Sequence, residues 1–272
     1  MNAHQLYQNI KLKKSYLCIG LDTDISKIPS HLLLHDDPVF EFNKAIIDLT
    51  HDLCVAYKPN IAFYESMGSK GWDSLQKTLQ HIPNNILTIA DAKRGDIGNT
   101  AEMYANTFFN TYSFDGVTIA PYMGFDSIAP FLKHKNKWSI VLALTSNKGS
   151  EDFQMLKVDS GPYVYEEVIR KCITWSNEDQ LMLVVGATNE NHFKSIRSIA
   201  PHHFFLVPGI GAQGGDLESV SKNCFNSSCG ILVNASRSIL YASSDKDFAA
   251  AARNEALKLQ QQMEHLLAEE NI

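Results

Sequence analysis

The sequence predicts an α/β fold, a (β/α)8 barrel of the TIM type, built as one domain over residues 1–272. Eight short apolar runs recur along the chain, and polar stretches compatible with helices separate them. The runs are continuously apolar rather than alternating, which is typical of parallel strands buried on both faces. Eight strand–helix units in about 250 residues is the usual size of such a barrel. A doubly wound open sheet is the alternative, because it shows the same alternation of elements.

The individual elements follow from this alternation. The predicted strands are Tyr16–Leu21, Val55–Phe63, Ile86–Ala90, Gly116–Ala120, Trp138–Leu144, Leu181–Gly186, Phe204–Val207 and Gly230–Val233. The predicted helices between them are Phe40–Leu53, Trp72–His81, Thr100–Thr111, Ile128–His134, Tyr163–Ser176 and Asn191–Ile199. A final segment, Asp247–Leu267, spaces its apolar residues three or four apart, so we expect an amphipathic helix that closes the outer layer.

Composition and charge argue against several classes of protein. The net charge of −6 argues against nonspecific nucleic-acid binding, which needs a basic surface. No apolar run approaches the length of about 18 residues that a membrane span needs. The first 15 residues lack the apolar core of a signal peptide. Five scattered cysteines suit reduced, structural thiols, so we expect a cytoplasmic protein without membrane or nucleic-acid partners.

The most informative run is Asp91-Ala-Lys93-Arg-Gly-Asp96, which follows the apolar segment Ile86–Ala90. Residues two apart on a strand point to the same side, so Asp91 and Lys93 are expected to project together. Asp96 follows as the chain leaves for a helix. An ammonium flanked by two carboxylates is costly to bury, and such clusters often carry chemistry. The run is therefore the candidate catalytic centre.

Polar residues follow nearly every predicted strand, at the end where barrel enzymes keep their catalytic groups. If the barrel closes, they share one mouth. The set comprises Asp22, Lys58, Asp91, Lys93, Thr145–Asn147, Pro208–Gly215 and Asn234–Arg237. Simpler roles stay open for three of them. Asp22 is also suited to cap a helix, Lys58 to reach the barrel rim by its aliphatic stem, and Ser146 to a turn.

The glycine-rich run Gly209–Gly215 has two interpretations. It matches the dinucleotide fingerprint G-x-G-x-x-G, but it lies in the seventh unit rather than the first, and the position about 20 residues on is Asn234 rather than an acid. A phosphate site fits better, because the loops after strands seven and eight of a barrel often hold phosphate. Gln213 and Arg237 would supply donors there. A tight turn with a surface arginine is the simpler alternative. No residue set has convincing metal spacing.

The run Asp91-Ala-Lys93-Arg-Gly-Asp96-Ile-Gly-x-Thr100 resembles the signature of the orotidine 5′-phosphate decarboxylase family, in particular its type 2 subfamily. Shorter motifs agree in order and spacing from about Leu17 to Ser238; they are Lys58–Glu65, Thr145–Asn147, Pro208–Gln213 and Ser236–Arg237. The resemblance implies a cofactor-free barrel enzyme. Its expected reaction is decarboxylation of orotidine 5′-phosphate to uridine 5′-monophosphate, the last step of de novo pyrimidine synthesis.

The resemblance also implies a role for each matching residue. Lys93 matches the proton donor to C6 of the pyrimidine, and the rest of the charged network is Asp91, Lys58 and Asp96. The implied substrate-binding residues are Asp22 for the ribose, Ser146 for the pyrimidine, and Pro208, Gln213, Gly214, Gly215 and Arg237 around the phosphate. In the family, Asp96 and Thr100 are contributed across a dimer interface, so a homodimer with shared sites is implied.

One departure and three rival functions remain. Many family members carry a proline where this chain has Lys148, which bears on the geometry of the loop after the fifth strand. The rivals are a metal-dependent decarboxylase of the same superfamily acting on a sugar-acid phosphate, an aldolase with a Schiff-base lysine, and a nucleotide-binding barrel without catalysis.

Overall fold

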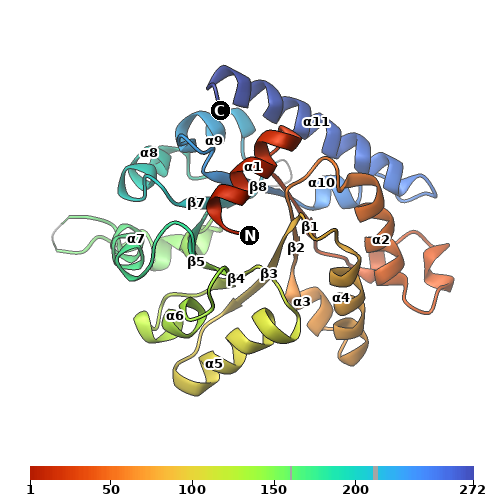
Figure 1. The fold of residues 1–272 in the computed structure, drawn as a ribbon, viewed down its shortest axis with the longest axis horizontal. Helices are drawn as coiled ribbons and strands as arrows, with labels where there is room; N and C mark the ends of the chain where they lie inside the picture. The colour runs from red at the N-terminus through yellow and green to blue at the C-terminus, as the bar shows by residue number, and fades with distance from the viewer. Residues whose placement is uncertain (160, 211–213) are drawn as a thin grey trace.

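Eight parallel strands form a closed barrel in sequence order, with helices arranged around it (Figure 1). The computed structural model describes residues 1–159, 161–210 and 214–272. The strands are β1 (Leu17–Leu21), β2 (Ala56–Pro59), β3 (Leu87–Arg94), β4 (Gly116–Ile119), β5 (Trp138–Leu144), β6 (Leu181–Val185), β7 (Phe204–Pro208) and β8 (Ile231–Ala235). Because β1 pairs with β8, the predicted barrel is confirmed and the open sheet is excluded.

The helices form the outer layer. They are α1 (Ala3–Lys13), α2 (Pro38–Thr50), α3 (Ile61–Glu65), α4 (Ser69–His81), α5 (Gly98–Asn106), α6 (Phe125–Leu132), α7 (Val164–Trp175), α8 (Glu190–Ile199), α9 (Leu217–Cys224), α10 (Arg237–Leu240) and α11 (Phe248–Glu269). Each helix predicted between strands is present, with shifted ends, and α11 closes the layer as expected. Of these helices, none combines the length and apolarity needed to cross a membrane.

Three local differences from the prediction have physical causes. The second strand ends at Pro59 rather than Phe63, because the Asn60 side chain accepts a hydrogen bond from the Ala62 N–H and caps α3. The third strand continues beyond Ala90 to Arg94, so the charged run belongs to the strand itself. Helix α9 was not predicted because it directly follows the glycine-rich run, which reads as a loop.

The core lies between the strands and the helices that cover them. Its largest fully buried side chains are aromatic, and Trp138 meets Phe204 edge to face across the starts of β5 and β7. All five cysteines are buried and unpaired, as expected for structural thiols. The apolar strands therefore bury both faces, which is the burial pattern that their sequence predicts.

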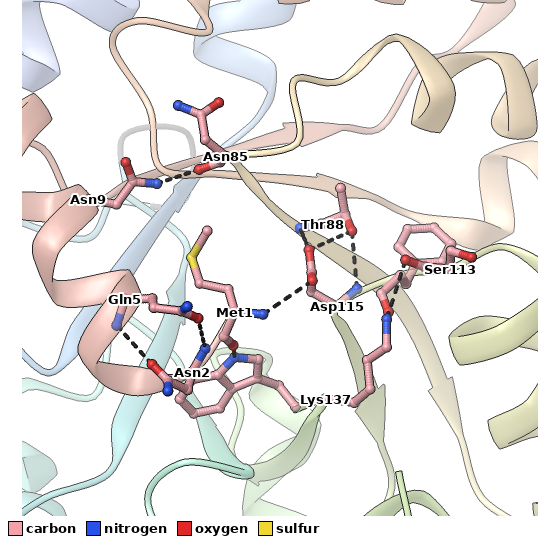
Figure 2. Close-up of polar contacts among 11 residues, drawn as sticks. Met1, Asn2, Gln5, Asn9, Asn85, Thr88, Ser113, Asp115 and Lys137 are labelled. Carbon is pink, nitrogen blue, oxygen red and sulfur yellow. Dashed lines mark hydrogen bonds and ion pairs between the residues drawn. The ribbon is translucent and has the colours of Figure 1, made fainter. Parts of the chain in front are cut away.

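Helix α1 lies across the N-terminal end of the barrel (Figure 1), and polar contacts hold it there (Figure 2). Its first turn is held by reciprocal hydrogen bonds between Asn2 and Gln5. The Trp138 indole N–H donates to the Met1 carbonyl at 2.7 Å, and Asn9 donates to the carbonyl of Asn85. These contacts reach residues just before β3 and at the start of β5. The end of the barrel away from the polar residues is thus covered by packing.

We predict that Ile10→Ala lowers the free energy of unfolding by about 2–5 kcal/mol, because the Ile10 side chain of α1 is fully buried. Chemical denaturation measures the loss of stability. Leu12→Ala is the matched control on the same helix. Because Leu12 is 78% exposed, this substitution should change the free energy of unfolding by no more than about 0.5 kcal/mol. Equal losses in both variants would contradict the packing role of α1.

Candidate active site

A cavity of about 520 Å³ opens at the C-terminal ends of the strands; β2 to β8 each supply part of its wall, and Asp22 lines it directly after β1. It brings together seven of the predicted site residues: Asp22, Lys58, Asp91, Lys93, Ser146, Pro208 and Arg237. Leu142, Val184 and Leu206 form an apolar wall from β5, β6 and β7. The charged side chains come mainly from β1 to β3, across the barrel. The cavity therefore suits a ligand with both charged and apolar faces.

The Asp91 carboxylate lies between two ammonium groups. Its Oδ2 is 2.7 Å from Lys58 Nζ, and its Oδ1 is 2.5 Å from Lys93 Nζ. Asp91 is 11% exposed and Lys58 only 4%, whereas Lys93 is 52% exposed and open to the cavity. The expected alternation of lysine and aspartate is present within one chain for these three residues.

The electrostatic balance keeps the buried pair charged. Burial alone would raise the pKa of Asp91, but Lys58 and then Lys93 outweigh it and hold that pKa well below its usual range. Burial would lower the pKa of Lys58, but Asp91 followed by Asp22 raise it above its ordinary value. Lys58 is therefore a buried ion-pair partner, and the alternative of a lysine extended to the barrel rim is wrong.

The backbone of β3 changes conformation at the charged run. Asp91 and Lys93 do share one side, as strand alternation predicts, yet the strand is not regular there. The pairing with β4 shifts register between Ala90 and Arg94, and Lys93 has φ of +47°. A left-handed conformation costs a side-chain-bearing residue roughly 1–2 kcal/mol. The structure thus places Lys93 by an irregularity that periodicity does not reveal.

Asp22 lines the cavity directly after β1 and has one buried carboxylate oxygen. Its Oδ1 makes no hydrogen bond within the part of the chain that the structure describes. The alternative role as a helix cap is wrong, because Asp24 caps the short helix that follows by accepting from the Ser26 N–H. A buried carboxylate oxygen without a donor is costly, so a hydroxyl from a ligand would satisfy it.

The loop after β5 folds back onto the mouth. Gly186 permits this, because a Cβ there would lie only 2.6 Å from the Ser146 nitrogen. The Thr145 N–H donates to Gln154 Oε1 at 2.8 Å, which ties the end of β5 to the returning loop. Gln154 lines the cavity but was not predicted, since it comes from the loop rather than from a strand end. Lys148 is exposed and begins a 3-10 turn, Lys148–Asp152.

Four predicted residues do not line the cavity of their own chain. Asp96 accepts a hydrogen bond from the neighbouring Ile97 N–H, and Thr100 is exposed on α5. Gly214 and Gly215 lie beyond the lining residues of β7, and a Cβ at Gly215 would be 2.5 Å from that of Ala187. Gln213 lies outside the described residues.

The chain that joins the charged run to α5 is held by a contact with α3. The Arg94 guanidinium forms an ion pair with Glu65, which lies at the end of α3, and donates to the Ala92 carbonyl at 2.9 Å. The same guanidinium lies 5.3 Å from the ring centre of Tyr104 on α5. Glu65 and Arg94 therefore link the two motifs that the sequence places 29 residues apart.

The cavity also contains residues to which the sequence analysis assigned no role. Thr118 is a polar side chain inside the apolar strand β4, and that contrast was the available signal. Asn60 follows the Lys58-Pro pair directly and also caps α3. Asn234 was noted at the end of β8 without a role; it is buried and its amide donates to Ser236 Oγ at 3.2 Å.

Charged groups held beside an apolar wall, at the end of the barrel where catalysis gathers, define a (β/α)8-barrel enzyme. Within that class, the chain belongs to the orotidine 5′-phosphate decarboxylase / HUMPS family, whose sequence model matches residues 15–253.

Individual relatives support the assignment over nearly the whole chain. Orotidine 5′-phosphate decarboxylase of Phocaeicola vulgatus is 57% identical over 272 residues, covering 99% of this chain and 100% of the relative. The Flavobacterium johnsoniae enzyme of that name is 57% identical over 270 residues and covers 98% of each chain. The solved structure of Leishmania donovani OMP decarboxylase has a TM-score of 0.81 at 35% identity, covering 96% of this chain and 100% of that one. The enzyme class expected from the sequence is confirmed.

We predict that Lys58→Met raises the pKa of Asp91 toward its ordinary value, because one of its two ammonium partners is lost. In the native protein, ionised Asp91 stabilises the fold above the unfolded pKa of about 3.9, and this contribution is lost as pH falls through the lower folded pKa. Carboxyl NMR titration measures the shift. Lys222→Met, which removes the same charge from the surface of α9, is the control. An Asp91 titration unchanged by Lys58→Met would refute the pairing.

Proposed function

We propose that the chain decarboxylates orotidine 5′-phosphate to uridine 5′-monophosphate without a cofactor, and that Lys93 protonates C6. The observation that carries this is the Lys58–Asp91–Lys93 array in a cavity of suitable size at the barrel mouth. The relatives named for this activity cover nearly the whole chain. The reaction would take place in the cytoplasm as the last step of de novo pyrimidine synthesis.

The chemistry needs a positive charge fixed at one carbon. When the bond from C6 to the carboxyl carbon breaks, CO2 leaves and the electron pair stays on C6 in the ring plane, where the ring π system cannot delocalise it. Stabilisation toward the upper end of the range for enzymes, roughly 20 kcal/mol, is then required. An ammonium preorganised at the developing charge supplies part of it. Lys93 then gives its proton to C6 and recovers one from water, to which it is open.

Asp91 and Lys58 support this step in different ways. Asp91 holds the Lys93 ammonium at 2.5 Å, so the ammonium is positioned before the substrate arrives. Its negative charge beside the substrate carboxylate would also favour departure of that carboxylate. Lys58 is buried and holds the second oxygen of Asp91, which prevents the carboxylate from turning away.

The remaining lining residues suit the rest of a nucleotide. The buried, unpartnered oxygen of Asp22 fits a ribose hydroxyl. Ser146, at the folded-back loop, would contact the pyrimidine. Pro208 and Arg237 line the mouth at the ends of β7 and β8. The phosphate would bind there, with further contacts from Gln213, Gly214 and Gly215. Binding energy from a phosphate remote from C6 would help to hold the substrate for reaction.

We predict that Lys93→Ala abolishes turnover while uridine 5′-monophosphate still binds, because the proton donor is lost and the other contacts remain. Ultraviolet absorbance follows conversion of orotidine 5′-phosphate, and calorimetry measures binding. Lys258→Ala, an exposed lysine on α11, is the control and should keep full activity. Near-normal turnover by Lys93→Ala would exclude Lys93 as the proton donor. EDTA should leave wild-type turnover unchanged, whereas loss of activity would favour the metal-dependent rival.

The proposed assembly is a homodimer in which Asp96 and Thr100 complete the partner's site. Both residues lie outside the cavity of their own chain, as such sharing requires. Exposed large apolar side chains gather after the neighbouring strands β3, β4 and β5; they are Ile97, Met103, Tyr122, Met123, Phe125 and Phe153. Tyr122 and Phe153 lie 6.4 Å apart by ring centres, so the loops after β4 and β5 meet. An apolar surface of this kind is typical of a subunit interface.

We predict that a mixed dimer of Lys93→Ala and Asp96→Asn protomers regains about half of the wild-type activity, because one of its two shared sites then contains only native residues. Each variant alone should be nearly inactive. Two different affinity tags isolate the mixed dimer, and ultraviolet absorbance measures its turnover. The control pairs Lys93→Ala with Asp91→Asn, which lie in the same site and should not complement. Absence of mixed dimers, or of complementation, would contradict the shared site.

A further inference from the structure

We propose that Thr118 is a positioning residue for proton transfer: its hydroxyl fixes both the Lys93 backbone and the Asp91 carboxylate. The inference rests on the proposed function, because it concerns the step in which Lys93 protonates the substrate. Thr118 is 1% exposed, lies on β4 and lines the cavity. It is uncharged, and the sequence motifs of the site do not include it.

The hydrogen bonds of the Thr118 hydroxyl have only one possible direction. The Lys93 backbone N–H can only donate, so Thr118 Oγ1 accepts from it at 2.9 Å. The ionised Asp91 carboxylate can only accept, so the single hydroxyl proton of Thr118 points to Asp91 Oδ1 at 3.1 Å. The hydroxyl thus connects the backbone of the proton donor to the carboxylate that holds its ammonium. Reversal of either bond would leave two acceptors or two donors facing each other.

The irregular pairing of β3 with β4 explains why a side chain is needed there. Ala90 pairs with Val117 and Arg94 pairs with Ile119, so three residues of β3 lie opposite Thr118 alone. The backbone N–H and C=O of Thr118 cannot supply hydrogen-bond partners for all three residues. The Thr118 hydroxyl takes the place of a ladder carbonyl for the Lys93 N–H, which would otherwise lack a partner beside the cavity.

The conformation of Lys93 makes this hydrogen bond consequential. Of the described non-glycine residues with positive φ, Lys93 alone lines the cavity. A lysine adopts the left-handed region only where its surroundings impose it. Thr118 binds the backbone N–H of Lys93 itself. This hydrogen bond therefore restrains rotation about the N–Cα bond of Lys93, which sets its φ angle. Without it, the backbone can relax and carry the Lys93 ammonium away from its place beside Asp91.

A merely structural role predicts something different. If Thr118 only filled space in β4, valine would replace it without loss, because the two side chains have nearly the same shape. If the hydroxyl positions the array, valine should impair the chemical step and serine should preserve it. The contact between Lys93 and Asp91 serves the proton-transfer step rather than substrate binding. In the valine variant, kcat should therefore fall while KM changes little.

The experiment compares Thr118→Val, Thr118→Ser and wild type in turnover of orotidine 5′-phosphate. Thr118→Val should lower kcat about 10- to 100-fold with KM within about threefold, the size expected when a buried hydrogen bond to a charged group is lost. Thr118→Ser should stay within about threefold of wild type in both constants. Thr50→Val is the matched control: its buried hydroxyl bonds the Ile46 carbonyl and Tyr57 at 2.7 Å each, away from the cavity, and its kcat should be unchanged.

A crystal structure of Thr118→Val gives a second result that does not depend on activity. It should show Lys93 with negative φ and its ammonium displaced from Asp91; if this variant does not fold, Thr118→Ala carries the same expectation. Retained positive φ and an unchanged Lys93–Asp91 contact would overturn the inference, as would unchanged kcat or equal losses in the serine variant. Failure of the proposed function would show instead as absence of turnover by the wild-type protein.

Discussion

The placement of one carboxylate between two ammonium groups is the constraint on which the site depends. Asp91 is nearly buried, and its charge is tolerable there only because Lys58 and Lys93 lie against its two oxygens. Lys58 comes from β2 and Asp91 from β3, so the array exists only when these neighbouring strands end together at the barrel mouth. Burial of this charge cluster costs free energy, and the closed barrel with its apolar core offsets that cost. The position of Asp91, and with it the charged array, therefore depends on the fold of the whole barrel.

Much of the fold could be predicted because continuous apolar runs report burial on both faces. The bounds of β5, Trp138–Leu144, were predicted exactly as they occur, since polar residues flank the run. The predicted bounds were wrong where the apolar residues of a strand run directly into those of a helix. The apolar side chains of α3 extend those of β2, and only the cap formed by Asn60 separates the two elements. The left-handed conformation of Lys93 has no counterpart in periodicity, because it occurs where the Lys93 N–H donates to Thr118 on another strand, a contact that the pattern of one strand does not reveal.

The charged part of the site could also be predicted, whereas its neutral part could not. Lys58, Asp91 and Lys93 stand out because charges are rarely placed at the ends of buried strands. Thr118 and Gln154 do not stand out, since threonine is common in strands and glutamine in loops. Asp96 and Thr100 show a different limit: one chain alone does not reveal what they contact, and only the resemblance assigned them to a partner. Gln213, outside the described residues, keeps its role as a prediction.

The pairing of β1 with β8 has a consequence for how the protein is made. Leu17 pairs with Val233, so the first strand lacks a neighbour on one edge until the last strand has left the ribosome. At roughly 5–20 residues per second, translation of the intervening 200 or so residues takes about 10–40 s. During this interval the nascent chain exposes an unpaired, apolar strand edge, which is a template for aggregation. The same closure that completes the mouth of the barrel therefore leaves one strand edge of the unfinished polypeptide unprotected until synthesis is nearly complete.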